Sequence, residues 1–136
     1  MIPRKISEIV AEAAEMPYKE DKIARLRAYD HPALRGYLRM ALDPNMKMAL
    51  PEGRPPFKPS KVPDLESVLY REFRRMYIFF PGGNTNLKPG RREQLFITFL
   101  ESLDPKEADF ILDVVKAKKL PEGLDEATIW EAFPGL

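Results

Sequence analysis

Six of the prolines fall within residues 43–63, and this cluster constrains the fold more than any other feature of the sequence. A proline inside a helix costs about 3 kcal/mol, because it removes a backbone donor and clashes with the preceding turn. The segment is therefore predicted to be extended rather than helical. The six residues are Pro44, Pro51, Pro55, Pro56, Pro59 and Pro63.

The same segment is too apolar for a free linker. Its large apolar residues are Met46, Met48, Leu50 and Phe57. We expect the segment to cross the domain as a strap and to bury some of these side chains. The parts of the chain on either side of it are too small for separate cores. The sequence therefore predicts a single domain over residues 1–136.

Outside the strap, apolar residues recur at helical spacing, as Ile6, Ile9, Val10 and Ala13 do. No segment alternates convincingly with a period of two. We therefore predict an all-α protein of about seven helices. The expected helices cover about 4–15, 19–29, 32–42, 64–79, a helix opening at Pro89 or Gly90, 105–119 and a short helix from Asp125.

Helix starts are marked by a capping side chain close to a proline. Asp30-His31-Pro32 and Asp104-Pro105 both have this form, and Asp64 is a suitable cap for the fourth helix. His31 is the only histidine of the chain. Because it lies beside a predicted cap, we expect it to have a structural role rather than a catalytic one.

The charge balance limits the possible functions. Lys and Arg total 22 against 21 Asp and Glu, a formal net charge of +1. Proteins that bind polyanions without regard to sequence are usually far more basic, so a nucleic-acid site would need the basic residues gathered on one face. No stretch approaches the roughly 18 apolar residues of a membrane span, and the first residues do not form a secretory signal. We expect a cytoplasmic protein without a membrane partner.

The sequence carries no recognisable catalytic motif. The stretch FFPGGNTNLKPGRREQLF, residues 79–96, has glycines before a helix start, but Lys88 is followed by Pro89 and not by the Ser or Thr of a phosphate-binding loop. The absence of cysteine excludes disulfides, thiolate metal sites and a cysteine nucleophile. Glu8, Glu12 and Glu15 share a helix face, as solvated carboxylates commonly do. We predict no enzyme, cofactor, metal or small-molecule substrate.

Basic residues occur in groups along the predicted helices. The like-charged pairs Arg35/Arg39 and Arg71/Arg75 cost a few tenths of a kcal/mol unless an anion or an acidic group offsets them. Arg91 and Arg92 open a helix, where the unpaired N–H groups already favour an anion. Two interpretations stay open: contact with an anion, foremost a nucleic-acid phosphate, or pairing with the acids of the chain itself.

Two long stretches resemble the N-terminal DNA-binding domain of ATP-dependent DNA ligases. RREQLFITFLESLDPKEADFILDVVKAKKLPEGLDEATIWEAF, residues 91–133, is similar to the end of that domain. KISEIVAEAAEMPYKEDKIARLRAYDHPALRGYLRMALDPNMK, residues 5–47, resembles its opening helices. The resemblance implies a helical domain that contacts the backbone of a duplex from its minor-groove side. The K-x-D-G motif that carries the adenylylated lysine is absent, so these residues cannot ligate DNA.

The ligase resemblance also implies a set of DNA contacts by position. The residues are Asn84, Lys88, Gly90, Arg91, Arg92, Lys118, Lys119 and Gly123. The phrases ALPEG, Ala49–Gly53, and GGN-x-x-L, Gly82–Leu87, are in addition similar to a group of small uncharacterised proteins of T4-like tailed phages. That second resemblance implies no activity.

Two hypotheses follow. The first is a non-enzymatic accessory protein of a tailed phage that binds the phosphate backbone of double-stranded DNA with little sequence preference. The second is a protein–protein interaction module with the same fold: a phage assembly or virion component, or an adapter to host or phage replication or transcription machinery. For the second, Trp130 and Phe133 are candidate anchors, although their i,i+3 spacing on the final helix favours packing in the core.

Overall fold

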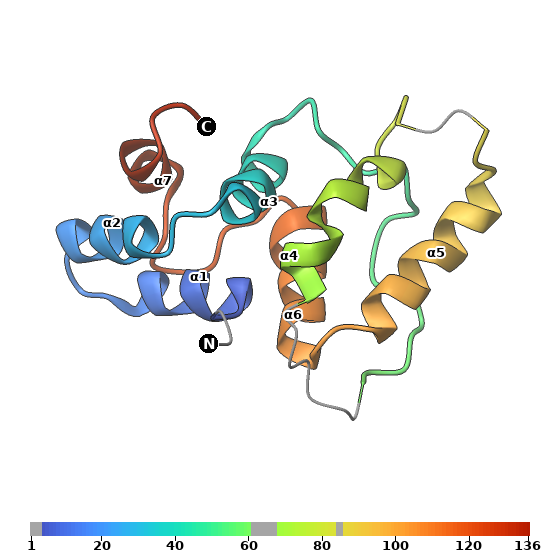
Figure 1. Cartoon of the computed structure of the whole chain (residues 1–136), viewed down its shortest axis with the longest axis horizontal. Coiled ribbons are helices and arrows are strands. Elements are labelled where there is room, and N and C mark those ends of the chain that lie inside the picture. Colours follow the sequence, from blue (N-terminus) through green and yellow to red (C-terminus); the bar gives the residue numbers. More distant parts are fainter. Residues whose placement is uncertain (1–3, 61–67, 84–85) are drawn as a thin grey trace.

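The computed structural model describes residues 4–60, 68–83 and 86–136, which form an all-α domain (Figure 1). This confirms the predicted fold class. The described residues contain no strand. Their elements are α1 (Ile6–Glu15), α2 (Lys19–Ala28), α3 (Pro32–Leu42), α4 (Val68–Glu72), the 3₁₀ helix η1 (Phe73–Phe79), α5 (Pro89–Glu101), α6 (Pro105–Phe110), the π-helix η2 (Ile111–Lys116) and α7 (Glu126–Ala132).

The helices are spread along one long axis. α1, α2 and α7 lie together at one end, α3, α4 and α6 occupy the middle, and α5 lies at the other end (Figure 1). The apolar stripe predicted for α1 faces inward and is buried. The N-terminus of α1 is joined to α6, because the Glu107 carboxylate accepts a hydrogen bond of 2.8 Å from the Ser7 backbone N–H.

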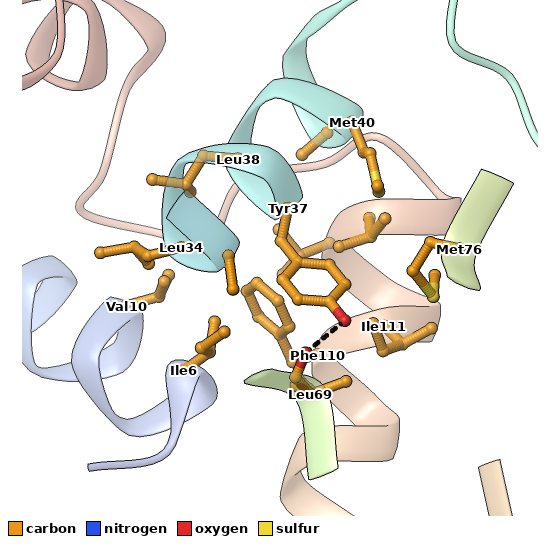
Figure 2. Close-up of a cluster of buried hydrophobic side chains, with 14 of the residues drawn as sticks. Ile6, Val10, Leu34, Tyr37, Leu38, Met40, Leu69, Met76, Phe110 and Ile111 are labelled. Carbon is orange, nitrogen blue, oxygen red and sulfur yellow. Dashed lines mark hydrogen bonds between the residues drawn. The ribbon is translucent and has the colours of Figure 1, made fainter. Parts of the chain in front are cut away.

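Tyr37 of α3 lies at the centre of the middle layer, among apolar side chains from α1, α4, η1 and the α6–η2 helix (Figure 2). Its side chain is 0% exposed, and its hydroxyl donates a hydrogen bond of 2.7 Å to the Leu69 carbonyl. Burial, followed by the nearby Glu107 and Glu72 carboxylates, raises the pKa of Tyr37 far above its usual value. The phenol therefore stays neutral and serves as a fixed donor in the core.

The described part of the strap, residues 43–60, contains no helix, as the prolines predicted, and it has turns or bends at 44–45, 49–50 and 52–53. Among its contacts with the rest of the domain are two backbone N–H donors. The Ala49 N–H donates to the Phe79 carbonyl at 2.7 Å, and the Lys58 N–H donates to the Glu101 carboxylate at 2.8 Å. Met48 is buried, whereas Met46, Leu50 and Phe57 pack partly against the core. The last predicted strap positions, 61–63, lie outside the described residues.

Two predicted helices change type along their length. The helix expected over 64–79 starts outside the described residues, with its proposed cap Asp64, and then continues as α4 and the tighter η1. The helix expected over 105–119 is α6 followed by the wider η2, where the Ala117 N–H reaches back five residues to the Leu112 carbonyl. All four aliphatic residues of η2 are buried. Apolar spacing predicted helices here, but it does not resolve one helix type from another.

The predicted helix-start signals are confirmed in α3 and α6. His31, rather than Asp30, is the N-cap of α3, and its Nδ1 accepts a hydrogen bond of 3.0 Å from the Ala33 N–H. The Asp104 carboxylate does the same for the Lys106 N–H at 3.0 Å. Asp30 instead forms an ion pair with Arg35 at 2.6 Å. The expected structural role of His31 is thus confirmed.

Candidate binding surfaces

The turn before α5 is held by an arginine that the sequence placed among the DNA contacts. Arg92 Nε donates to the Ile78 carbonyl at 3.0 Å, and its Nη2 donates to the Leu87 carbonyl at 3.2 Å. These bonds fasten the start of α5 to the end of η1. Arg92 is therefore a structural residue of this turn, and much of its hydrogen-bonding capacity is already used.

The neighbouring residues face solvent. Lys88, the N-cap of α5, is exposed, and so are Gly90 and Arg91 in the first turn. A Cβ added at Gly90 would meet no atom within 4 Å. Within the described part of the chain, the side chains of Lys88 and Arg91 form no hydrogen bond or ion pair, and neither does Arg74 of η1. Asn84, the remaining candidate of this turn, lies outside the described residues.

The second group of candidates follows η2, away from the start of α5 (Figure 1). Lys118 has a φ of 56°, and its Nζ donates to the carbonyls of Met40 and Asp43, both at 2.6 Å. It thus neutralises the negative C-terminal end of α3, and burial lowers the pKa of its ammonium group. Lys119 is exposed.

Gly123 has a structural reason to be glycine. Its φ is 94°, and a Cβ at this position would overlap the backbone carbonyl of Ala14. Its own carbonyl accepts a hydrogen bond from the Lys22 ammonium. Of the eight residues implied by the ligase resemblance, the structure thus gives internal contacts to Arg92, Lys118 and Gly123. It leaves Lys88, Gly90, Arg91 and Lys119 at the surface.

Charge is distributed unevenly along the chain. Residues 68–92 contain six basic residues and one acid, Glu72, a net charge of +5. Because the whole chain carries +1, the remaining residues carry −4. The six are Arg71, Arg74, Arg75, Lys88, Arg91 and Arg92. The sequence shows these groups, but it does not show that Arg92 fastens the start of α5, where Lys88 and Arg91 lie, to the end of η1.

A groove of about 740 Å³ lies on a different part of the molecule, between α1 and the α6–η2 helix. Val10, Phe110, Val114 and Leu120 contribute its apolar floor. Its charged lining consists of Glu8, Glu12, Glu15, Asp109, Asp113, Glu122, Lys106 and Lys119. The groove was not predicted. Only the shared face of Glu8, Glu12 and Glu15 indicated one of its walls, because the opposite wall comes from residues about a hundred positions later in the chain.

The two aromatic residues of the last helix differ in environment. Phe133 is 1% exposed, and the Arg35 guanidinium lies 5.0 Å from the centre of its ring. It belongs to the core. Trp130 is 40% exposed, and its Nε1–H donates to the Glu126 carboxylate at 3.1 Å. Only Trp130 is therefore placed to contact another molecule.

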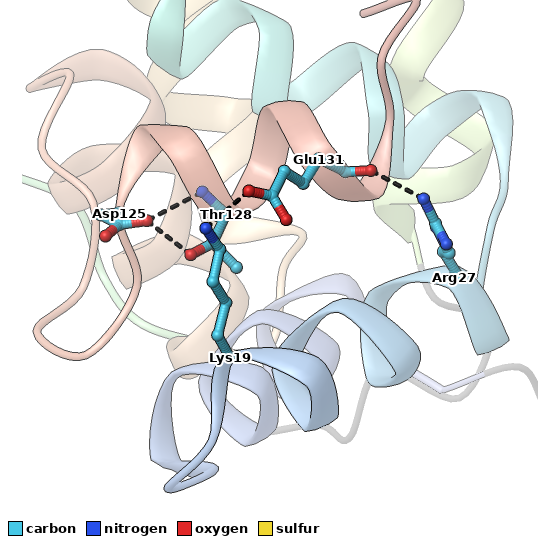
Figure 3. Close-up of polar contacts among 5 residues, drawn as sticks. All are labelled: Lys19, Arg27, Asp125, Thr128 and Glu131. Atoms are coloured by element: carbon cyan, nitrogen blue, oxygen red, sulfur yellow. Dashed lines mark hydrogen bonds and ion pairs between the residues drawn. The ribbon is translucent and has the colours of Figure 1, made fainter.

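α7 is fixed to α2 by charged contacts (Figure 3). Lys19 pairs with Glu131 at 2.6 Å, which raises the pKa of Lys19 above its ordinary value. Arg27 donates to the Glu131 carbonyl at 2.7 Å and to the Ala132 carbonyl at 3.1 Å. The Asp125 carboxylate caps the helix by accepting from the Thr128 N–H at 2.8 Å. This end of the molecule is closed by contacts between residues far apart in sequence.

Within residues 4–60, 68–83 and 86–136, no group of three or more His, Asp or Glu side chains is placed to hold a metal ion. No helix in the same residues is long and apolar enough to cross a membrane.

Fold and surfaces together define an all-α domain with a basic segment, residues 68–92, and a separate groove lined mainly by acids. A family model described as a family of unknown function (DUF6433) matches residues 9–122, so the chain belongs to this family. The chain shows no significant similarity to a curated protein or to a solved structure.

Proposed function

We propose that the basic segment, residues 68–92, binds the phosphate backbone of double-stranded DNA with little sequence preference. The observation that carries the proposal is the concentration of +5 charges in residues 68–92 of a chain whose total is +1. Arg74, Lys88 and Arg91 have no internal partner among the described residues, so no ion pair has to break before they contact an anion. Cations in this state supply most of the affinity for DNA that is independent of sequence.

The exposed residues of the segment 68–92 suit a contact with the phosphate backbone of DNA. The α5 N-terminus offers unpaired N–H groups, and Gly90 leaves room for a phosphate to approach them. Arg75 is 3.5 Å from Glu72, a pair that is weak at an exposed site and easily exchanged for a phosphate. If Arg74, Arg75, Lys88 and Arg91 each contact a phosphate, log Kd changes with log salt by a slope of about 3 to 4.

Charge reversal at Arg74 and Arg91 tests the proposal without disturbing the turn that Arg92 holds. A labelled duplex is titrated at two salt concentrations with wild type, with Arg74→Glu/Arg91→Glu and with a matched control, Lys47→Glu/Lys106→Glu. The control makes the same charge change at exposed residues outside the segment 68–92. We expect the first variant to bind the duplex more than about tenfold more weakly than wild type. Its slope of log Kd against log salt should be smaller by about 2. Equal losses in both variants would contradict the proposed site.

The duplex target and the accessory role in an infected cell are proposed from sequence resemblance alone. The likeness to ligase DNA-binding domains supports a duplex as the target, and the likeness to T4-like phage proteins supports an accessory role in an infected cell. A duplex, a nicked duplex and a single strand compared in the same titration would show whether the ligase-type preference for duplex is retained.

A second candidate function is a protein–protein interaction module, and the exposure of Trp130 favours it. Trp130 is 40% exposed, and the helix that carries it is held by contacts with α2. It is a suitable contact residue, since tryptophan is enriched among residues that dominate interfaces. Trp130→Ala should then leave the melting temperature nearly unchanged and abolish the capture of a phage or host protein. Phe133→Ala is the contrasting variant, because loss of its buried ring should unfold the domain.

A further inference from the structure

We infer that the groove between α1 and the α6–η2 helix is the docking site for a basic amphipathic helix of a partner protein. The inference concerns a different surface from the proposed DNA site and does not depend on it.

The shape of the groove suits a helix. Its two walls are themselves helices, α1 on one side and α6 with η2 on the other, and its volume is about 740 Å³. Val10, Phe110 and Val114 lie at its base, where they are buried by the domain but still border the groove. Ala11 on the α1 wall is small and exposed, which leaves room above this base. A groove between two helices with an apolar base accepts the apolar stripe of a third helix.

The charge of the α1 wall specifies the partner further. Glu8, Glu12 and Glu15 follow one another at spacings of four and three, so they project from one face. Glu12 is paired with Arg4 and also lies 3.6 Å from Arg25. Glu8 and Glu15 have no ion-pair partner among the described residues. Two unpaired carboxylates therefore remain along one side of the apolar base.

The opposite wall is nearly neutral. The strap residue Arg54 pairs with both Asp109 and Asp113 at 2.8 Å, which compensates these carboxylates from outside the groove. At the end of the groove, Glu122 has no ion-pair partner in the described part of the chain. The matching helix thus has an apolar stripe with lysines or arginines concentrated on the side that faces α1.

The same charges disfavour other occupants. A nucleic-acid backbone would be repelled by Glu8, Glu15 and Glu122, and only Lys106 and Lys119 of the lining would attract it. A second copy of this chain would have to present its basic residues 68–92. In that segment the most basic helix, η1, buries Met76 and Phe79 in its own core, so its apolar stripe is not available to the groove.

The test uses a labelled synthetic peptide of about 16 residues, long enough to form a helix when bound. Leucines at helical spacing form its apolar stripe, and lysines flank them on one side. A second peptide carries glutamates in place of the lysines. Binding of each to the full chain is measured by fluorescence anisotropy at low and moderate salt. We expect the lysine peptide to bind, and the glutamate peptide to bind at least about tenfold more weakly.

Two matched triple variants locate the binding. Glu8→Lys/Glu15→Lys/Glu122→Lys reverses the unpaired acids of the groove. Glu20→Lys/Asp21→Lys/Glu93→Lys makes the same charge change at exposed acids elsewhere. Circular dichroism establishes that both are folded. We expect the groove variant to lose at least about tenfold in affinity for the lysine peptide and the control less than about threefold.

Three outcomes would overturn the inference: no binding of the lysine peptide, equal losses in both triple variants, or equal binding of the two peptides. Sedimentation of the chain alone tests whether a second copy of the chain occupies the groove. A self-association that the groove variant abolishes, and that competes with the peptide, would show that a second copy fills the groove instead.

Discussion

The two ends of the molecule use charged side chains in opposite ways. At the end formed by α1, α2 and α7, Lys22 donates to the Gly123 carbonyl, Arg27 to the Ala132 carbonyl, and Lys19 pairs with Glu131. At the start of α5, Lys88 and Arg91 have no such partner among the described residues. At the first end these three cations stabilise the fold itself, whereas Lys88 and Arg91 at the start of α5 are available for a ligand.

This contrast continues between adjacent residues. Arg91 and Arg92 have the same side chain and the same helix start, yet only Arg92 bonds to the preceding turn. Lys118 and Lys119 differ in the same way. A basic residue therefore indicates a binding site only when its own chain offers it no acceptor. Four predictions test this distinction.

The largest expected effect is at Glu107, which joins α6 to the N-terminus of α1. Its side chain is 0% exposed, and its carboxylate accepts from the Ser7 N–H. Glu107→Ala leaves this buried donor without its partner and should lower the free energy of unfolding by about 3 kcal/mol. Urea denaturation measures the loss. Glu15→Ala, an exposed change on the same helix pair, should stay within about 0.5 kcal/mol. Equal losses in the two variants would show that Glu107 does not stabilise the contact between α6 and α1.

The next-largest effects are expected at two glycines that were among the candidate DNA contacts, Gly123 and Gly90. Gly123→Ala places a Cβ against the Ala14 carbonyl at a positive φ, and we expect a loss of about 2 kcal/mol or more. Gly90→Ala has open space and a helical backbone, so it should raise stability by about 0.5 kcal/mol. Thermal denaturation of the two variants measures the loss of stability expected for the first and the gain expected for the second. A loss at Gly90 as large as that at Gly123 would break the contrast between the two ends.

The adjacent arginines should separate stability from binding. Arg92→Ala removes the bonds to Ile78 and Leu87 and should cost about 1 to 2 kcal/mol. Arg91→Ala should leave stability within about 0.5 kcal/mol but weaken duplex binding. Each variant is measured by urea denaturation and by the DNA titration. If Arg91→Ala is the less stable of the two, the structural assignment of Arg92 is wrong.

The smallest effect is pH-dependent and concerns the cap of α6. A hydrogen bond from Lys5, 2.8 Å long, lowers the pKa of Asp104 below its usual 3.8. A lowered carboxyl pKa stabilises the fold above the unfolded value, and the contribution is lost as pH falls through the folded value. Asp104→Asn keeps a capping oxygen but no charge. It should be less stable than wild type by under about 1 kcal/mol at neutral pH, and the difference should disappear below pH 3.8. A constant difference across that range would exclude the ion pair as its cause.

Much of the fold could be predicted because its signals are local. Pro32 and Pro105 mark two helix starts, and the strap prolines exclude a helix from 43–60. The junction between α4 and η1, and that between α6 and η2, could not be predicted. Apolar spacing over six or seven residues fits a 3₁₀, an α or a π turn about equally well, and packing in the core selects among them.

The candidate sites were less predictable than the helices. The exposed cations of the α5 start were visible in the sequence as Lys88 and Arg91. The groove was not, because its walls come from opposite ends of the chain and meet only when α6 packs against α1. Trp130 lies in α7 and Phe133 follows as its C-cap, yet Phe133 is buried in the core and Trp130 is at the surface. Which of them is covered depends on where α2 and α3 lie.

The sequence by itself determined the all-α class, the order of the helices and the absence of a helix in the described strap, because proline, helix caps and apolar periodicity act within one or two turns of chain. Only the tertiary structure decided which charges serve the fold and which face solvent. The acceptors of Lys118, for example, are carbonyls more than 70 residues earlier in the chain. A charged group is neutralised by whatever packing brings within about 3 Å, and that neighbour is set by the fold and not by sequence position.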